Sequence, residues 1–144
     1  MAQTKKSKKS EEFNIDKFVQ SLSIQLKTLN VTSNDITGEK VEMKKVAFYE
    51  ISELVDKELV IDTKMEISFE PSSPFTIIAE FRLIYRLQES ISKTQISKNI
   101  DDILSPCGNT FSLITGFLSE KLLSIPMIIS PNFSYTNVKS SSKE

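Results

Sequence analysis

The sequence predicts a protein of the α+β class, in which an antiparallel sheet is followed by a helix. Three stretches, 18–27, 59–70 and 75–87, alternate apolar and polar residues with a period of two. Strict alternation gives a strand one dry face and one wet face, which is typical of antiparallel sheets. After Ser90 the apolar residues recur at helical spacing instead. Strands that are followed by a helix in this way indicate the α+β class.

The second and third alternating stretches are predicted to form a hairpin. Segment 71–74 (Pro-Ser-Ser-Pro) separates them, and residues of these types favour a turn. Both stretches place their apolar residues at odd-numbered positions, and residues that pair directly must share a face of the sheet. Paired residue numbers therefore sum to an even value, and Phe69 is expected opposite Phe75 or Ile77. The predicted inward residues are Leu59, Ile61, Thr63, Met65, Ile67 and Phe69 in one strand and Phe75, Ile77, Ala79, Phe81, Leu83, Tyr85 and Leu87 in the other.

Residues 32–57 carry mixed signals. Segment 32–40 contains Asn, Asp and Gly and is expected to be a loop. The apolar residues of 41–43 favour a strand, whereas those of 48–55 are spaced more nearly as in a helix. We expect a further edge strand and a short turn of helix in this part of the chain. The first alternating stretch, upstream of it, places Phe18, Leu22, Ile24 and Leu26 on one face.

An amphipathic helix is predicted over 106–123. Ser105 suits the N-cap, and Pro106 would then occupy the first helical position, where its missing N–H costs nothing. Gly108 and Gly116 lower the intrinsic stability of this helix by roughly 1 kcal/mol each relative to Ala. The helix therefore depends on packing, or on close approach to another helix. Its apolar stripe consists of Phe111, Ile114, Leu118 and Leu122, with Leu113 and Phe117 beside it.

The length of 144 residues suits one domain, which we place at 13–138. Residues 1–12 and 139–144 are rich in Ser and Lys and are predicted to be disordered basic tails. Because the whole chain has a net charge of −1, the body between them is acidic, which argues against a nucleic-acid partner. No apolar run is long enough to cross a membrane, and no apolar segment follows the N-terminal lysines as in a signal peptide. The cytoplasm is therefore the expected location.

The residue types that most often carry catalysis are scarce. The chain has no histidine, and its three glycines belong to no nucleotide-binding motif. The single cysteine, Cys107, excludes an intrachain disulfide and is expected to be a small buried residue. Asp101 and Asp102 are expected to supply favourable negative charge at the start of a helical turn, not to bind a metal. The sequence thus predicts no enzyme, no catalytic residue, no cofactor and no metal site.

The C-terminal half of the chain resembles the SecB family of chaperones. The resemblance lies in segment 105–111 (SPCGNTF), which runs into the helix, and in segment 126–133 (PMIISPNF), which follows it. In that family a proline-containing step also precedes a helix, and an extended segment closing with Pro and Asn-Phe follows, although here the cysteine follows the proline. The first strand and the long hairpin come in the family's order, so the resemblance covers 18–133.

This resemblance implies a four-stranded antiparallel sheet with a long helix on one face, assembled as a dimer of dimers. It also implies ATP-independent holding of non-native polypeptides, for export or for control of a specific client such as an antitoxin. In the family, strand residues, the segment after the helix and the linker before it line the client groove. The matching positions, each of which could instead lie in the core or in a subunit interface, are Leu22, Ile24, Ile96, Ile125, Met127, Ile129 and Phe133.

Two departures from the family leave docking to the export motor SecA doubtful. The chain becomes rich in Ser and Lys soon after segment 126–133, where the family continues into a second helix. It also lacks the cysteine- and histidine-bearing extension that some homologues present to SecA. Two other hypotheses stay open: a structural or adaptor subunit with one dedicated protein partner, and a small-ligand-binding cup in which the helix closes over the sheet.

Overall fold

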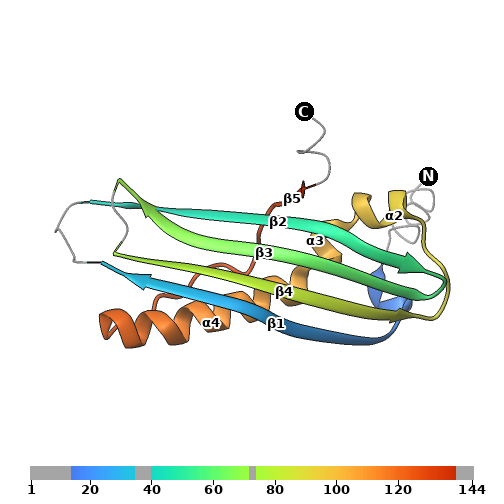
Figure 1. Ribbon diagram of the computed structural model, residues 1–144, viewed down its shortest axis with the longest axis horizontal. Coiled ribbons are helices and arrows are strands. Elements are labelled where there is room, and N and C mark those ends of the chain that lie inside the picture. The colour runs from blue at the N-terminus through green and yellow to red at the C-terminus, as the bar shows by residue number, and fades with distance from the viewer. Residues whose placement is uncertain (1–13, 35–39, 72–73, 139–144) are drawn as a thin grey trace, which may run out of the picture.

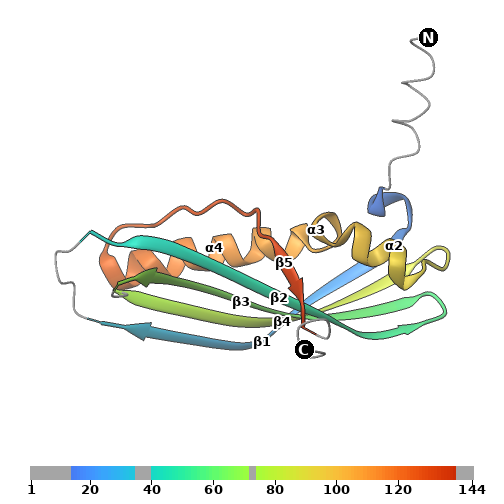
Figure 2. The ribbon, with the colours of Figure 1, turned by 90° about the horizontal axis from the view of Figure 1, so that it is seen from above.

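The protein has two layers, a sheet and a set of helices that covers one of its faces (Figures 1 and 2). The computed structural model describes residues 14–34, 40–71 and 74–138. Within these residues the sheet has five strands in the order β1-β4-β3-β2-β5. The elements are η1 (Ile15–Lys17), β1 (Val19–Ser33), β2 (Glu42–Val55), β3 (Glu58–Glu70), β4 (Phe75–Leu87), α2 (Lys93–Lys98), α3 (Ile100–Ile103), α4 (Ser105–Leu123) and β5 (Tyr135–Asn137). The α+β class, with four long antiparallel strands and a long helix, is confirmed, and the short β5 is added to it.

The predicted hairpin is confirmed as β3 and β4. Their antiparallel register places Ile67 opposite Ile77, and every directly paired residue number sums to an even value. The rings of Phe69 and Phe75 meet edge to face with their centroids 5.1 Å apart, as the parity of the alternation requires. All the predicted inward residues of both strands are buried, because this face of the sheet lies under the helical layer.

The expected short turn of helix within 32–57 is wrong, because residues 48–55 belong to the strand β2. β2 is extended over its whole length and pairs with β3 from Glu42 to Val55. One extra residue between Ile51 and Glu53 forms a bulge, which shifts the inward positions from odd to even numbers. Ile51 and Leu54 consequently both pack against the core at a spacing of three, which imitates a helix in the sequence. Of the predicted loop 32–40, its first two residues belong to β1 instead, and 35–39 lie outside the described residues.

A bulge of the same kind extends the inner face of β1. β1 pairs with β4, and the register shifts by one residue between Leu26 and Thr28. Leu26 is opposite Phe81, whereas Leu29 is opposite Ala79 and Val31 is opposite Ile77. These partners all belong to the buried face of β4, so the three β1 residues lie on the same inner face. The strand therefore continues its apolar face beyond the stretch that alternates in the sequence.

The helix α4 packs on the inner face of the sheet and runs along its strands (Figures 1 and 2). Phe111 is fully buried, and its ring lies edge to face against Phe81 of β4 with the centroids 6.3 Å apart. The expected N-cap role of Ser105 is wrong, since Ser105 is the first residue of the helix and the cap is Leu104, which makes no side-chain bond. The chain enters α4 directly from α3, and the N–H groups of Cys107 and Gly108 donate to the Leu104 carbonyl. A capping side chain is therefore not needed here.

Candidate polypeptide-binding surface

The chain reverses after α4 and runs back along the helix as an extended segment. Ser124 adopts a left-handed conformation with φ of 65°, and its N–H donates to the carbonyl of Glu120 at 2.8 Å. Residues 124–134, which we call the strap, then run antiparallel to α4 and end at β5 (Figures 1 and 2). β5 pairs in parallel with the middle of β2, where Ala47 is opposite Tyr135. The strap thus covers the flank of α4 that faces β2.

Small side chains on this flank of α4 contact the main chain of the strap. Ser119 Oγ accepts a hydrogen bond from the Met127 N–H at 2.6 Å, and Ser112 Oγ donates to the Ile129 carbonyl at 2.8 Å. The main chain of the strap also passes over the two helix glycines, at Pro131 and Met127. The predicted close approach of the glycine-bearing helix is therefore made with an extended segment and not with another helix.

The end of the strap is fixed by Lys45 on β2. The Lys45 ammonium donates to the carbonyl groups of Ser130, at 3.0 Å, and Asn132, at 2.8 Å. It also lies 4.3 Å from the centroid of the Phe133 ring, a favourable cation–π distance. Partial burial lowers the pKa of Lys45 from its ordinary value, because desolvation penalises the charged form. The Lys45 side chain therefore contacts Ser130, Asn132 and Phe133 and holds the end of the strap against β2.

The strap alternates inward and outward side chains. Met127 packs against the core and is half-buried, and Ile129 is buried. Between them Ile128 is 89% exposed, and Ile125 at the start of the strap is 69% exposed. An extended backbone points successive side chains to opposite sides, so two of these residues fill space beside α4 while their neighbours face solvent.

Within the described residues, the opposite flank of α4 is exposed. Leu113 is 77% exposed and Phe117 is 61% exposed. At 100° per residue, Phe117 lies roughly across the helix from Ser112 and Ser119, so it faces away from the strap and toward the β1 side. Among the described residues no strand pairs with the outer edge of β1, and the inner face of its C-terminal half is exposed. We call this exposed apolar set the β1-side surface: Leu26, Leu29, Val31, Leu113 and Phe117.

The structure divides the predicted client-binding residues into three places. Leu22 and Ile24 lie half-buried on the inner face of β1, next to the β1-side surface. Ile96 belongs to α2 and is fully buried. The other four, Ile125, Met127, Ile129 and Phe133, lie on the strap, beyond α4 from β1. Because Ile129 and Phe133 are buried as well, a client could contact them only if the strap moved.

None of the five residues of the β1-side surface was among the predicted site residues, although Leu26 was placed on the apolar face of the first alternating stretch. The bulge in β1 hides Leu29 and Val31 from an alternation pattern that ends at residue 27. Leu113 and Phe117 stand beside the apolar stripe of α4 and were assigned to it. A search for apolar residues off the helical stripe, together with one allowed shift of parity in the strand, would have found the other four.

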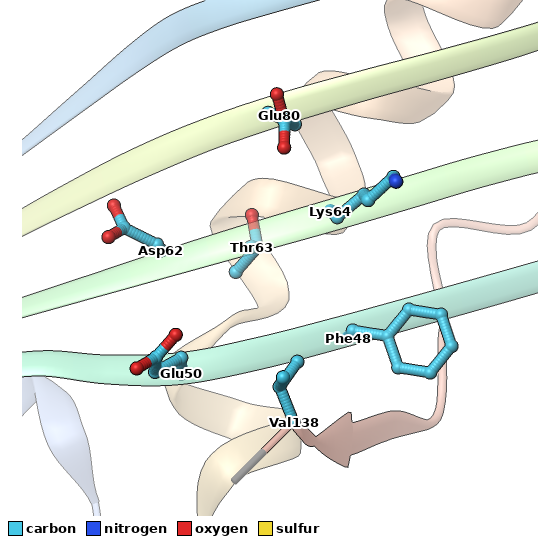
Figure 3. A pocket seen from close by; sticks show the side chains of 7 residues that line it. All are labelled: Phe48, Glu50, Asp62, Thr63, Lys64, Glu80 and Val138. Carbon is cyan, nitrogen blue, oxygen red and sulfur yellow. The ribbon is translucent and has the colours of Figure 1, made fainter. Parts of the chain in front are cut away.

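The outer face of the sheet carries a depression of about 390 Å³, lined mostly by polar side chains of β2, β3 and β4 and by Val138 (Figure 3). The side chains form rows across the strands: Phe48 is opposite Lys64, Lys64 is opposite Glu80, and Glu80 is opposite Thr28, whose hydroxyl donates to it at 2.6 Å. Such rows solvate the outer face of a sheet. Most of the exposed lining of the depression is nevertheless apolar, and Phe48 and Val138 are among the residues that line it.

Cys107 is buried, as its sequence context indicated. Its Sγ lies 3.2 Å from the Thr63 hydroxyl and 3.5 Å from Met65 Sδ. Burial raises the pKa of the thiol to about 11, so the thiol is protonated and unreactive near neutral pH. Burial also raises the pKa of Tyr85, whose hydroxyl donates to the carbonyl of Ile103. Among residues 14–34, 40–71 and 74–138, no group of His, Cys, Asp or Glu side chains could hold a metal ion.

The architecture, with four long antiparallel strands and α4 packed on one face of the sheet, defines a SecB-like fold. A SecB-like chaperone of Mycobacterium tuberculosis, Rv1957, solved in complex with a ChAD peptide from the Rv1956 HigA1 antitoxin, matches with a TM-score of 0.62. The two sequences are 8% identical, and the match covers 75% of this chain and 85% of that one. At this identity the likeness establishes the fold, and it confirms the fold that the resemblance at 105–133 implied.

A second solved structure, of a protein of unknown function from Streptococcus agalactiae, matches with a TM-score of 0.47 and 9% identity, over 76% of this chain and 97% of that one. No protein-family model and no curated protein sequence matches this chain. In the part of the chain that the structure describes, no helix is both long and apolar enough to cross a membrane.

Proposed function

We propose that this protein is an ATP-independent chaperone that holds non-native polypeptides, and that the β1-side surface is where an extended apolar segment binds first. The observation that carries the proposal is the exposure of Phe117 and Leu113 on α4 beside an inner sheet face that is left open at β1. Large exposed apolar side chains that gather on one side of a folded protein mark an interaction site.

The open edge of β1 adds a second means of binding. Its unpaired N–H and C=O groups can accept an extended strand, and main-chain hydrogen bonds of this kind tolerate many sequences. Apolar burial on the inner face then supplies affinity, at about 25 cal/mol per Å² before the cost of ordering the client. Leu22 and Ile24, which line the same face, are the predicted client contacts that lie next to the β1-side surface, whereas the exposed Ile125 lies on the strap.

The kind of client is a further part of the proposal, and the comparison supports it. The solved SecB-like chaperone holds an antitoxin peptide, and an antitoxin-like or export-bound polypeptide would suit the same class of surface here. No nucleotide, cofactor or metal takes part in this function. The proposed site of action is the cytoplasm, and docking to SecA is not part of the proposal.

We also propose that the protein acts as a homo-oligomer, a dimer of dimers. A long strand with an unpaired edge and exposed apolar side chains is prone to pair with another chain. A second copy at part of the β1 edge would protect it, while the rest of the β1-side surface could remain available to a client.

Native mass spectrometry combined with an aggregation assay tests the function. An unrelated unfolded protein is diluted out of denaturant with and without this protein, in the absence of nucleotide. We expect a dimer or tetramer and suppression of light scattering at near-stoichiometric ratios. A monomer that does not suppress aggregation would refute the proposal. A tight complex with one cellular partner, without general suppression, would favour the adaptor hypothesis instead.

A further inference from the structure

The contacts that hold the strap along α4 do not depend on which amino acids the strap contains. Toward the strap, Ser119 and Ser112 bond only to main-chain N–H and carbonyl groups, and Ser119 Oγ also donates to the Gly116 carbonyl of α4 at 3.1 Å. Gly108 leaves room for a main-chain carbonyl, that of Pro131. We call the four helix residues that contact the strap or lie beneath its main chain the track: Gly108, Ser112, Gly116 and Ser119.

The side chains of the strap alternate between inward and outward positions. Met127 and Ile129 point inward and pack against the core, while Ile128 between them faces solvent. This spacing is the one that any extended polypeptide with apolar residues at alternate positions presents. The strap therefore occupies its site in the manner of a bound client peptide.

We propose that the strap is an internal pseudo-client, and that an extended apolar segment of a non-native polypeptide displaces it from the track and takes its place. This inference rests on the chaperone function proposed above and concerns how that function is controlled. It assigns the strap residues Met127 and Ile129 a role as occupants of the client site. The walls of the site are the track on α4 and the core side chains beneath the strap.

Competition between strap and client has a measurable consequence. Because the strap belongs to the same chain, its effective concentration is high, and the apparent client affinity is lowered by the fraction of molecules whose track is occupied. A change that weakens the docking of the strap but leaves the track intact should tighten client binding. A residue that formed a wall of the client site would have the opposite effect when it was truncated.

Two adjacent strap residues provide a matched pair of variants. In Met127→Ser the inward side chain is removed, and in Ile128→Ser the outward one is removed. Binding is measured by fluorescence anisotropy with a labelled, carboxymethylated and permanently unfolded protein. We expect Met127→Ser to bind about fivefold more tightly than the wild type, since a half-buried side chain no longer holds the strap. Ile128→Ser should bind like the wild type.

A variant on β2, outside both the strap and the track, provides a second route to the same outcome. Lys45→Met removes the two bonds to the Ser130 and Asn132 carbonyl groups but keeps an unbranched side chain of similar length. It should also tighten client binding, by a similar factor. Thermal unfolding of each variant shows that the fold is retained, and of these two variants the one that stays folded suffices for the comparison.

Hydrogen exchange reports the displacement directly. The Met127 amide, which donates to Ser119 Oγ, should lose protection when the unfolded protein binds, while amides in the β3–β4 hairpin should keep theirs. Weaker or unchanged client binding in both Met127→Ser and Lys45→Met, or a strap that stays protected in the complex, would overturn this inference and leave the chaperone function standing. Absence of client binding by the wild type would refute the chaperone function itself.

Discussion

The carbonyl oxygen of Pro131 occupies the space where a Cβ on Gly108 would lie. Gly108 is buried in the first turns of α4, and Pro131 lies near the end of the strap, so this contact joins helix and strap at a point without any side chain between them. The atom that a substitution would meet belongs to the main chain and cannot rotate away. The strap can follow α4 closely only because residue 108 is a glycine.

A pair of glycine substitutions tests this relationship. Gly108→Ala forces Pro131 outward, and we expect the free energy of unfolding to fall by about 1–3 kcal/mol, as in other overpacked sites. At Gly116 an added Cβ would lie 3.8 Å from the Met127 carbonyl oxygen, an ordinary contact distance. Gly116→Ala should therefore be neutral or stabilising by up to about 1 kcal/mol through helix propensity. Urea unfolding measures both, and equal effects of the two would contradict the role of Gly108.

A buried hydroxyl on α4 allows a stabilising substitution. Thr115 is fully buried, and its Oγ1 has no hydrogen-bond partner among the described residues. Thr115→Val replaces the hydroxyl with a methyl group of similar shape and removes an unsatisfied polar group. We expect thermal unfolding to show a gain of about 1 kcal/mol.

Ser119 is the control for Thr115, one turn further along the same buried face. Its hydroxyl accepts the Met127 N–H, so Ser119→Ala leaves a strap amide unpaired and should lower the free energy of unfolding by about 1–2 kcal/mol. If Thr115→Val and Ser119→Ala had effects of the same sign, the hydrogen-bond assignment on this face would be wrong.

The parts of the fold that could be predicted are those in which apolar and polar residues alternate without interruption. The β3–β4 hairpin alternates strictly from end to end, so its faces, register parity and burial could all be predicted. In β1 and β2, bulges interrupted this alternation. The extra residue after Leu26 concealed the apolar half of β1, and the extra residue after Ile51 imitated a helix. A single inserted residue reverses the face of every residue beyond it, and no local pattern announces it.

The candidate site was less predictable for a related reason. Apolar residues of the core, of the strap and of an exposed surface look alike in a sequence, and only packing distinguishes Ile96, which is fully buried, from Phe117, which is exposed. The segment 126–131, with its apolar residues between two prolines, was correctly predicted to be extended. That it folds back onto α4 through main-chain contacts depends on the serine side chains of the helix, whose partners are not visible in the sequence.

The buried thiol makes stability depend on alkaline pH. The ordinary pKa of a cysteine is 9.0, and burial raises that of Cys107 to about 11. Between these values the unfolded chain has released the thiol proton and the folded chain has kept it, so the unfolded state is favoured as pH rises. The stabilisation is fully present below pH 9 and declines by about 1.4 kcal/mol per pH unit above it.

Urea unfolding between pH 8.5 and 10 measures this dependence, before the tyrosines contribute strongly. The pKa values of Tyr85 and Tyr135 are also raised by burial, and they extend the decline to higher pH. In Cys107→Ala the titrating thiol is absent, and the curve should be flatter in this window. A variant with the same slope as the wild type would show that another group titrates.

Client binding should depend on the β1-side surface more than on exposed apolar residues elsewhere. Leu29 lies on the inner face of β1 and Phe117 on the free flank of α4, so the double variant Leu29→Ser/Phe117→Ser removes apolar contact area from both sides of the surface while changing no core residue. We expect it to bind the labelled unfolded protein about tenfold more weakly, because each truncation removes apolar area that a client would bury. The matched control is Val55→Ser at the end of β2, which is as exposed as Phe117 but lies outside the surface. If Val55→Ser weakened binding as much as the double variant, the affinity would reflect general hydrophobicity and not this surface.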